Sequence, residues 1–260
     1  MKSLSRFLAF LAVLGLATVL SAADSAGNST VYELRTYTAT PGNLDKVLAR
    51  FRDHTLTIFE RHGMQNLGYA VPADATDGAG EKLVYLIAHR SRDAAKASWA
   101  AFSADPEWKK VAAESEAKGK IVAKVESLFL AAAEFSPAVS DYNGAPRIFE
   151  MRTYTTPEGK LGALDARFRD HTIALFEKHG MTSLGYYHPV DANKGAANTL
   201  VYFLAFPSRE AATASWAAFR ADPAWVEAKA ASEKGAGGSL TLPDGVKSVF
   251  LIPTDFSPTK

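Results

Sequence analysis

Three side chains that can bind ions or transfer protons alternate along one short segment, and the same three recur 117 positions later. Residues two apart on a β-strand point to the same side, so each trio shares one face. Arginine can clamp a carboxylate, glutamate can act as a base and tyrosine can donate a hydrogen bond. This pattern predicts a polar ligand-binding pocket. The six candidate residues are Glu33, Arg35, Tyr37, Glu150, Arg152 and Tyr154.

The intervening residues of the first segment indicate which way the trios point. Tyr32, Leu34, Thr36 and Thr38 form the better surface for packing helices. We therefore expect the charged trios to face an interior between two sheets. Buried charges are costly unless they are paired. The alternative interpretation is therefore a salt-bridge network that fixes how two halves of the chain pair.

Two histidines are the candidates for catalysis. His54 and His171 border the apolar stripe of a predicted helix in each half. An imidazole that reached the interior could act as a general base, or as a haem or metal ligand. The alternative is a hydrogen-bonded histidine at the margin of the core. His62 lies eight residues beyond His54, about 12 Å along a helix axis, so the two cannot chelate one metal ion. We predict no metal site.

The remaining histidines have structural interpretations. His62 and His179 precede a glycine in the last turn of a helix, where an imidazole can donate to the free carbonyls. His89 and His188 each occur in one half only, which we interpret as drift between the halves. The four tryptophans are spaced as helix anchors in the core: Trp99, Trp108, Trp216 and Trp225.

The elements that carry these residues form a duplicated small domain. Residues 31–69 and 148–186 are nearly the same segment written twice, 117 positions apart. A repeating unit of that length is too long for a solenoid. The sequence pattern of each copy predicts the order β-α-β-β-α-β, which is ferredoxin-like. In the first copy we expect strands at 31–38, 67–71, 83–89 and 127–133. A helix should span 43–62, another should start after Ser91, and a third at Asp105-Pro106.

An antiparallel sheet covered by helices on one face needs cover for the other. We therefore predict an α+β protein in which two tandem ferredoxin-like domains pair their sheets within one chain, as an intramolecular pseudo-dimeric α/β barrel. The predicted domains are residues 31–137 and 147–260. A polar tether at 24–30 precedes the first, and a linker at 138–146 joins the two.

The first residues are typical of an exported protein. Lys2 and Arg6 precede an apolar run at 7–20, which is followed by small residues. This pattern predicts a signal peptide over 1–23 and a periplasmic or secreted mature protein. The alternative is an uncleaved membrane anchor, although the run is shorter than the roughly 20 residues that span a bilayer.

Composition limits the partners further. The chain has no cysteine and a formal net charge of +1, with 47% hydrophobic and 22% charged residues. This balance is typical of a soluble globular protein and does not indicate nucleic-acid binding or stable membrane insertion after signal cleavage. We expect a small-molecule ligand, and the outward-facing helices leave room for a homo-oligomer.

The motifs YELRTY, PG, FRDHT…FE…HGM, LGY and the tryptophan-rich W-AF–ADP-W segment resemble the NIPSNAP family. The resemblance covers both copies and implies a ferredoxin-like fold of the dimeric α/β-barrel type. It brings no settled catalytic residues and no cofactor. Roles in vesicle trafficking and mitochondrial quality control are suggested for eukaryotic members, and these do not transfer to a chain with this leader.

The leading functional hypothesis is therefore an exported NIPSNAP-type barrel of undefined biochemical role that binds a small molecule. The alternative is an enzyme of the barrel superfamily, of oxygenase or isomerase type. In that case His54 or His171 would be the base, and Arg35 or Arg152 the anion clamp. A third hypothesis is haem binding through one of those histidines.

Overall fold

The computed structural model describes residues 29–138 and 147–260. The predicted signal peptide, residues 24–28 of the predicted tether and residues 139–146 of the predicted linker lie outside this part of the chain. Within it, no helix is both long and apolar enough to cross a bilayer.

The two copies have the same succession of elements, apart from their exact ends. The first consists of β1 (Val31–Ala39), α1 (Leu44–Arg50), η1 (Phe51–Thr55), α2 (Leu56–Arg61), β2 (Gln65–Pro72), η2 (Ala75–Asp77), β3 (Lys82–His89), α3 (Arg92–Ala104), α4 (Pro106–Ser115) and β4 (Val122–Ala132). The second consists of β5 (Ile148–Thr155), α5 (Leu161–Arg167), η3 (Phe168–Thr172), α6 (Ile173–Lys178), β6 (Thr182–Pro189), η4 (Ala192–Lys194), β7 (Thr199–Phe206), α7 (Arg209–Ala221), α8 (Pro223–Gly235) and β8 (Val246–Pro253).

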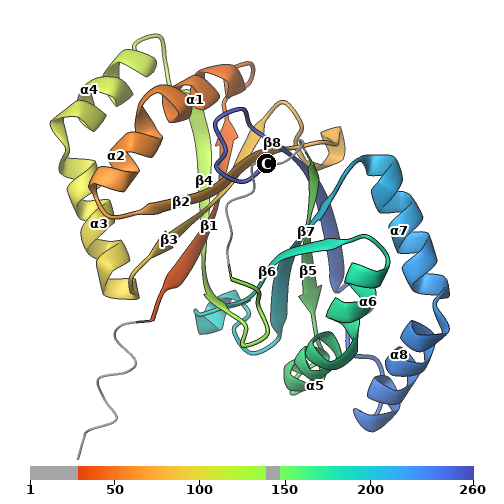
Figure 1. The fold of residues 1–260 in the computed structure, drawn as a ribbon. Helices are drawn as coiled ribbons and strands as arrows, with labels where there is room; N and C mark the ends of the chain where they lie inside the picture. Colours follow the sequence, from red (N-terminus) through yellow and green to blue (C-terminus); the bar gives the residue numbers. More distant parts are fainter. Residues whose placement is uncertain (1–28, 139–146) are drawn as a thin grey trace, which may run out of the picture.

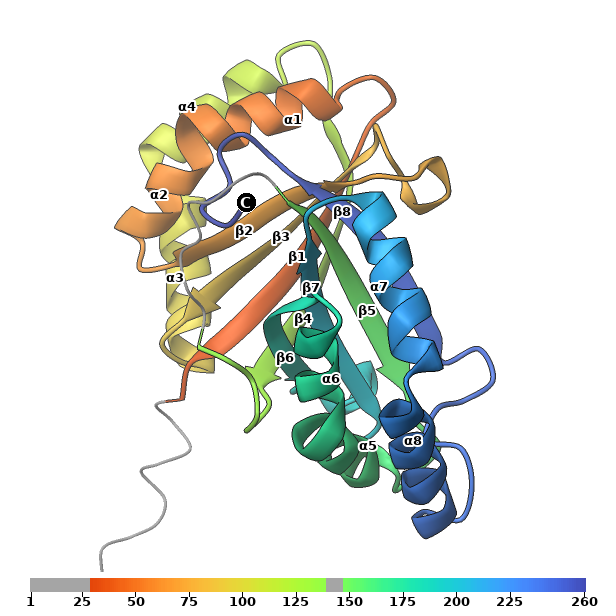
Figure 2. The ribbon, with the colours of Figure 1, turned by 45° about the vertical axis from the view of Figure 1, so that its right-hand side comes forward.

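The eight described strands close into one antiparallel barrel in the order β1-β3-β2-β8-β5-β7-β6-β4. Each copy supplies four adjacent strands, and the copies meet where β2 pairs with β8 and where β4 pairs with β6. The helices of each copy cover the outer surface of its own strands, on opposite sides of the barrel (Figures 1 and 2). This arrangement confirms the predicted pseudo-dimeric α/β barrel.

The two seams between the copies are short and are extended by the same device. β2 and β8 share three residue pairs, from Ala70↔Pro253 to Pro72↔Leu251. Beyond this ladder the backbone N–H of Tyr69 donates to the hydroxyl of Ser257 at 2.9 Å. At the other seam Tyr186 N–H donates in the same way to the Ser136 hydroxyl at 3.0 Å. The residues that follow β8 and β4 therefore stay beside the partner strand, and in each case a serine hydroxyl accepts the next backbone hydrogen bond.

The helix predicted at 43–62 contains a π-helical turn at 51–55, which the 3.6-residue period did not predict. The N–H of Leu56 bonds to the carbonyl of Phe51, five residues back. The Thr55 hydroxyl also donates to the carbonyl of Arg50 at 3.0 Å. The second copy has the same turn at 168–172, with Thr172 bonded to Arg167. A wider turn shifts the phase of every side chain after it.

The predicted helix starts are confirmed. The hydroxyl of Ser91 accepts from the N–H of Ala94, and Asp105 accepts from the N–H of Glu107, with proline next in the chain. β4 begins five residues earlier than predicted, because residues 122–126 are mostly exposed and include Lys124 and Glu126.

Aromatic side chains dominate the layer between helices and sheet. In the first copy Tyr69 and Tyr85 stack with ring centroids 5.2 Å apart, and Phe51 and Phe59 from the helix pack against Tyr85. In the second, Tyr186 and Tyr202 stack at 5.5 Å. The inner surface of the barrel carries a different set, centred on aliphatic side chains with a few aromatic rings.

We expect Ser257→Ala to lower the free energy of unfolding by about 1–3 kcal/mol, because it leaves the buried N–H of Tyr69 without its acceptor. Urea denaturation measures the change. Ser136→Ala should also be destabilising, since it removes the same acceptor at the other seam. The exposed Ser103→Ala is the control and should change stability by less than about 0.5 kcal/mol. A Ser257 variant as stable as this control would contradict the seam role.

Candidate functional site

The two charged trios lie on the outer surface of the barrel, against the helices. Glu33 accepts a hydrogen bond from Trp99 of α3, and Tyr37 packs on Phe51 of η1 with centroids 5.4 Å apart. The predicted inward orientation of Glu33, Arg35, Tyr37, Glu150, Arg152 and Tyr154 is therefore wrong. The reason is chemical: the helices offer indole N–H donors to the glutamates, so this polar face suits the helix side.

Glu33 is the centre of the first network. Its carboxylate accepts from Arg35 at 2.6 Å, from the indole of Trp99 at 2.7 Å and from the hydroxyl of Ser127 at 2.6 Å. Arg35 and Ser127 share Oε1. Nε2 of His89 lies 3.1 Å from Oε2, the oxygen that also accepts from Trp99. Arg35 stacks over the Trp99 ring, 4.1 Å from its centroid. A single buried carboxylate thus joins β1, β3, β4 and α3.

The second copy has the same network without the histidine. Glu150 accepts from Arg152, Trp216 and Ser248. Arg152 stacks over Trp216 at 4.3 Å. The position of His89 is taken by Phe206, which is fully buried. The alternative interpretation is confirmed in one respect, since Glu33 pairs with Arg35 and Glu150 with Arg152. Its expected role is wrong: among the described residues each network lies between sheet and helix within one copy, so it does not fix how the copies pair.

The surroundings of Glu33 keep its carboxylate ionised. Burial raises its pKa, but the hydrogen bonds from His89, Ser127 and Trp99, together with the charge of Arg35, outweigh burial and lower the pKa to about 2. A carboxylate with this many donors is a poor proton acceptor near neutral pH. We find no geometry in which it would act as the predicted base on a ligand in the barrel.

His54 and His171 do not reach the barrel interior. Both are exposed and lie on the π-helical turns, on the side away from the sheet. His54 lines a surface hollow of about 470 Å³ between α1 and α4. The predicted position at the border of the stripe assumed a regular helix. In addition, the sheet separates the described helices from the interior, so none of their side chains reaches it. The predicted approach to the inter-sheet cavity is wrong for both residues.

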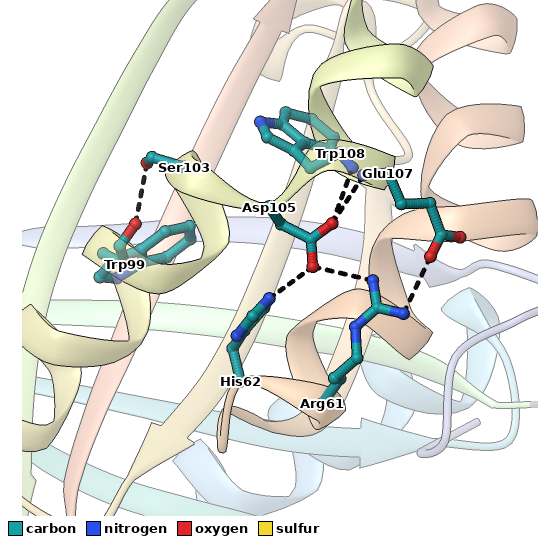
Figure 3. A network of polar contacts seen from close by, with 7 residues as sticks. All are labelled: Arg61, His62, Trp99, Ser103, Asp105, Glu107 and Trp108. Carbon is teal, nitrogen blue, oxygen red and sulfur yellow. Dashed lines mark hydrogen bonds and ion pairs between the residues drawn. The ribbon is translucent and has the colours of Figure 1, made fainter.

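His62 and His179 link two helix ends, as Figure 3 shows for the first copy. His62 ends α2 and its Nε2 lies 2.7 Å from the carboxylate of Asp105, which caps α4 and also binds Arg61. His179 makes the same contact with Asp222. The predicted donation to the terminal carbonyls is wrong, because each ring contacts an aspartate that caps the next helix. Within 29–138 and 147–260, no group of three His, Asp or Glu could hold a metal ion.

The barrel interior contains the cavity best suited to bind a ligand. Its volume is about 500 Å³, and both copies supply its walls. Of the described residues that line it, Arg147 alone carries charge, and this residue lies at the start of β5 with its Nε donating to the carbonyl of Lys260. Thr182, Ser183 and Thr259 also line it, but the Ser183 hydroxyl bonds to that of Tyr186 and the Thr259 hydroxyl donates to the carbonyl of Leu67. The apolar walls are Leu34, Leu67, Ala70, Val84, Leu86, Phe149, Leu184, Phe203, Ala205 and Leu251, with Tyr187.

The two halves of the interior are filled differently. Tyr187 packs against Tyr32 with centroids 4.9 Å apart, beside the β4–β6 seam. Ala70 is its counterpart in the first copy, beside the β2–β8 seam. The sequence shows this difference directly, as LGYA against LGYY. The alternate residues Tyr32 and Leu34, which we had expected to face the helices, instead pack in the interior.

We expect Glu33→Gln to destabilise the protein by about 3–5 kcal/mol, since it leaves the buried Arg35 without its counter-charge. The pKa of Glu33 is lowered from 4.5 to about 2, so its contribution is complete above pH 4.5 and disappears as the pH falls toward 2. Urea denaturation across this pH range should show that the free energy of unfolding falls less steeply with falling pH in the variant than in the wild type. Parallel pH profiles would contradict the network.

The matched control for that variant is His89→Phe, which copies the residue of the second half. It should cost less than about 1.5 kcal/mol, because Phe206 fills the equivalent buried position. A loss as large as that of Glu33→Gln would show that the imidazole is essential to the network.

We further expect Gly185→Ala to cost about 1–3 kcal/mol, because the new Cβ would lie 2.7 Å from Cε2 of Tyr187. Gly68→Ala is the matched variant, whose Cβ would meet only the Ser257 hydroxyl at 4.0 Å. Neither glycine has a positive φ, so backbone strain affects neither variant. Differential scanning calorimetry measures both, and equal losses would contradict the asymmetric filling.

Comparison with known proteins agrees with this architecture. A putative monooxygenase from Lactobacillus acidophilus is 11% identical, with a TM-score of 0.54 over 86% of this chain and 94% of that chain. An anthrone oxidase-like protein is 14% identical, with a TM-score of 0.54 over 90% and 96%. At these identities the likeness shows the fold alone. No curated protein matches significantly.

Shorter solved structures match one half at a time. A NIPSNAP family protein of unknown function from Agrobacterium tumefaciens is 21% identical over 46% of this chain and 100% of that chain, with a TM-score of 0.37. The NIPSNAP family model matches residues 32–137 and 149–258, which together make up most of the sequence. The chain therefore belongs to the NIPSNAP family, with two family domains in tandem.

Proposed function

We propose that this protein binds an apolar small molecule inside the barrel. The observation that carries the proposal is the cavity of about 500 Å³, whose walls come from both copies and are mostly apolar. Ligand sites typically have volumes of 300–1,000 Å³, apolar walls and a few polar groups that orient the ligand. Here Thr182 and Arg147 supply polar groups where β6 and β5 begin.

Binding agrees with the geometry better than catalysis by the predicted histidines does. His54 and His171 are exposed on the helices, on the other side of the sheet from the cavity. Glu33 and Glu150 are occupied by arginine, tryptophan and serine donors. The two similar barrels are named as a putative monooxygenase and an anthrone oxidase-like protein. At these identities the likeness supports a shared fold and assigns no reaction to this chain.

We also propose that the protein acts outside the cytoplasm. The support is the basic, apolar and small-residue pattern of residues 1–23. Expression of the full chain in a bacterium, followed by fractionation and intact-mass measurement, tests this. We expect the mature form to begin at Asp24, and a full-length product in the cytosol would contradict export.

Titration with N-phenyl-1-naphthylamine, an uncharged dye that fluoresces in apolar surroundings, tests binding in the barrel. We expect saturable binding in the micromolar range. Leu86→Phe places in the first copy the larger side chain that Phe203 supplies in the second, and it should weaken binding several-fold by reducing the cavity.

Val226→Ser, on the exposed surface of α8, is the control and should bind the dye as the wild type does. Absence of saturable binding to the folded wild-type protein would contradict the proposed function. Equal weakening by both variants would place the dye outside the barrel.

A further inference from the structure

We propose that the barrel holds one ring-shaped apolar ligand per chain, off the barrel axis beside the β2–β8 seam, and that Ala70 and Tyr187 determine this position. The proposal rests on the proposed function and specifies where and how many ligands bind. It follows from a comparison of the two copies within the structure, position by position.

Ala70 and Tyr187 occupy equivalent places in the duplicated fold. Ala70 pairs with Val84 on β3, and Tyr187 pairs with Val201 on β7. Each also pairs across a seam, Ala70 with Pro253 and Tyr187 with Ala132. A barrel with identical halves would have two equivalent spaces at these seams. The difference between alanine and tyrosine is therefore a difference in how much of each space is filled.

The tyrosine fills its space. Tyr187 is 2% exposed and packs with Leu130 and Val201, while its ring contacts Tyr32 at 4.9 Å and Phe203 at 6.2 Å between centroids. The ring lies against Gly185, where a Cβ would come within 2.7 Å of it. The β4–β6 side of the barrel is thus packed by the chain itself.

The equivalent space beside Ala70 is open. Gly68, the counterpart of Gly185, still lacks a side chain, yet no ring lies over it, and a Cβ there would meet only the Ser257 hydroxyl at 4.0 Å. Ala70 and Gly68 both line the cavity, together with Val84, Ala205 and Leu251. The first copy thus has the glycine that makes room for a ring, but it has alanine where the second copy has the tyrosine ring. A bound ligand can occupy that position.

The walls indicate the chemistry of the occupant. Phe149, Phe203 and Tyr187 present aromatic side chains to the cavity, and no described lining residue is acidic. Aromatic pairs gain energy beyond the burial of area when their rings meet edge to face or offset. An uncharged aromatic or polycyclic ring therefore fits this space best, in the place that Tyr187 fills on the other side.

Exchange of the two residues tests the inference, with N-phenyl-1-naphthylamine as the probe and circular dichroism as the check on folding. Ala70→Tyr should weaken binding at least tenfold, because the new ring can lie over Gly68 as Tyr187 lies over Gly185. Tyr187→Ala should open the equivalent space beside the β4–β6 seam and raise the stoichiometry from one dye per chain toward two. The double exchange, Ala70→Tyr with Tyr187→Ala, should restore one site per chain.

The outcomes separate this inference from the proposed function. A wild-type protein that binds no dye contradicts both. A wild type that binds while folded Ala70→Tyr binds equally well contradicts the inference alone, as does a folded double exchange that fails to regain binding. If Ala70→Tyr does not fold, Ala70→Leu takes its place as a smaller filling and should still weaken binding several-fold; unchanged binding would contradict the inference.

Discussion

Each copy forms a sheet of four strands whose two outer strands, β2 and β4 or β6 and β8, would otherwise have unpaired edges. An unpaired edge leaves a row of backbone donors and acceptors without partners. The other copy provides those partners: each seam has three residue pairs, which further backbone bonds and one serine hydroxyl extend. Because both seams close, the inner faces of the two sheets surround the cavity. The cavity is thus a direct result of pairing all edges.

Closure also separates the chemistry of the molecule into two layers. Outside the sheet, charged and aromatic groups fasten the helices, with Glu33 and Glu150 at the centre. Inside, the described lining of the cavity has a single charge, on Arg147. A buried carboxylate is stable only with several donors, and the indoles of α3 and α7 supply a donor that the inner surface lacks. The polar networks therefore fix the helices and leave the interior free for an apolar ligand.

The sequence was sufficient to predict the duplication, the order of elements, the barrel and most helix caps, since these depend on local periods and on the need to cover a sheet. The orientation of the first strand could not be predicted from alternation alone. Alternation shows that Glu33, Arg35 and Tyr37 share a face but not which face it is. Trp99 decides the orientation: it is a core anchor, as predicted, and its indole also donates to Glu33, which must therefore face the helices. The π-helical turn escaped prediction because FRDHT has no residue that interrupts a regular helix.

Ala70 and Tyr187 hold equivalent positions in the two copies but differ in size, and this difference has a consequence for how such a barrel can evolve. In a dimer of identical chains, one substitution appears on both sides of the axis, so a tyrosine that fills one half also fills the other. A gene that encodes both halves in one chain removes this restriction. One half can then specialise in packing while the other keeps its opening, and new specificity can arise without loss of the assembly.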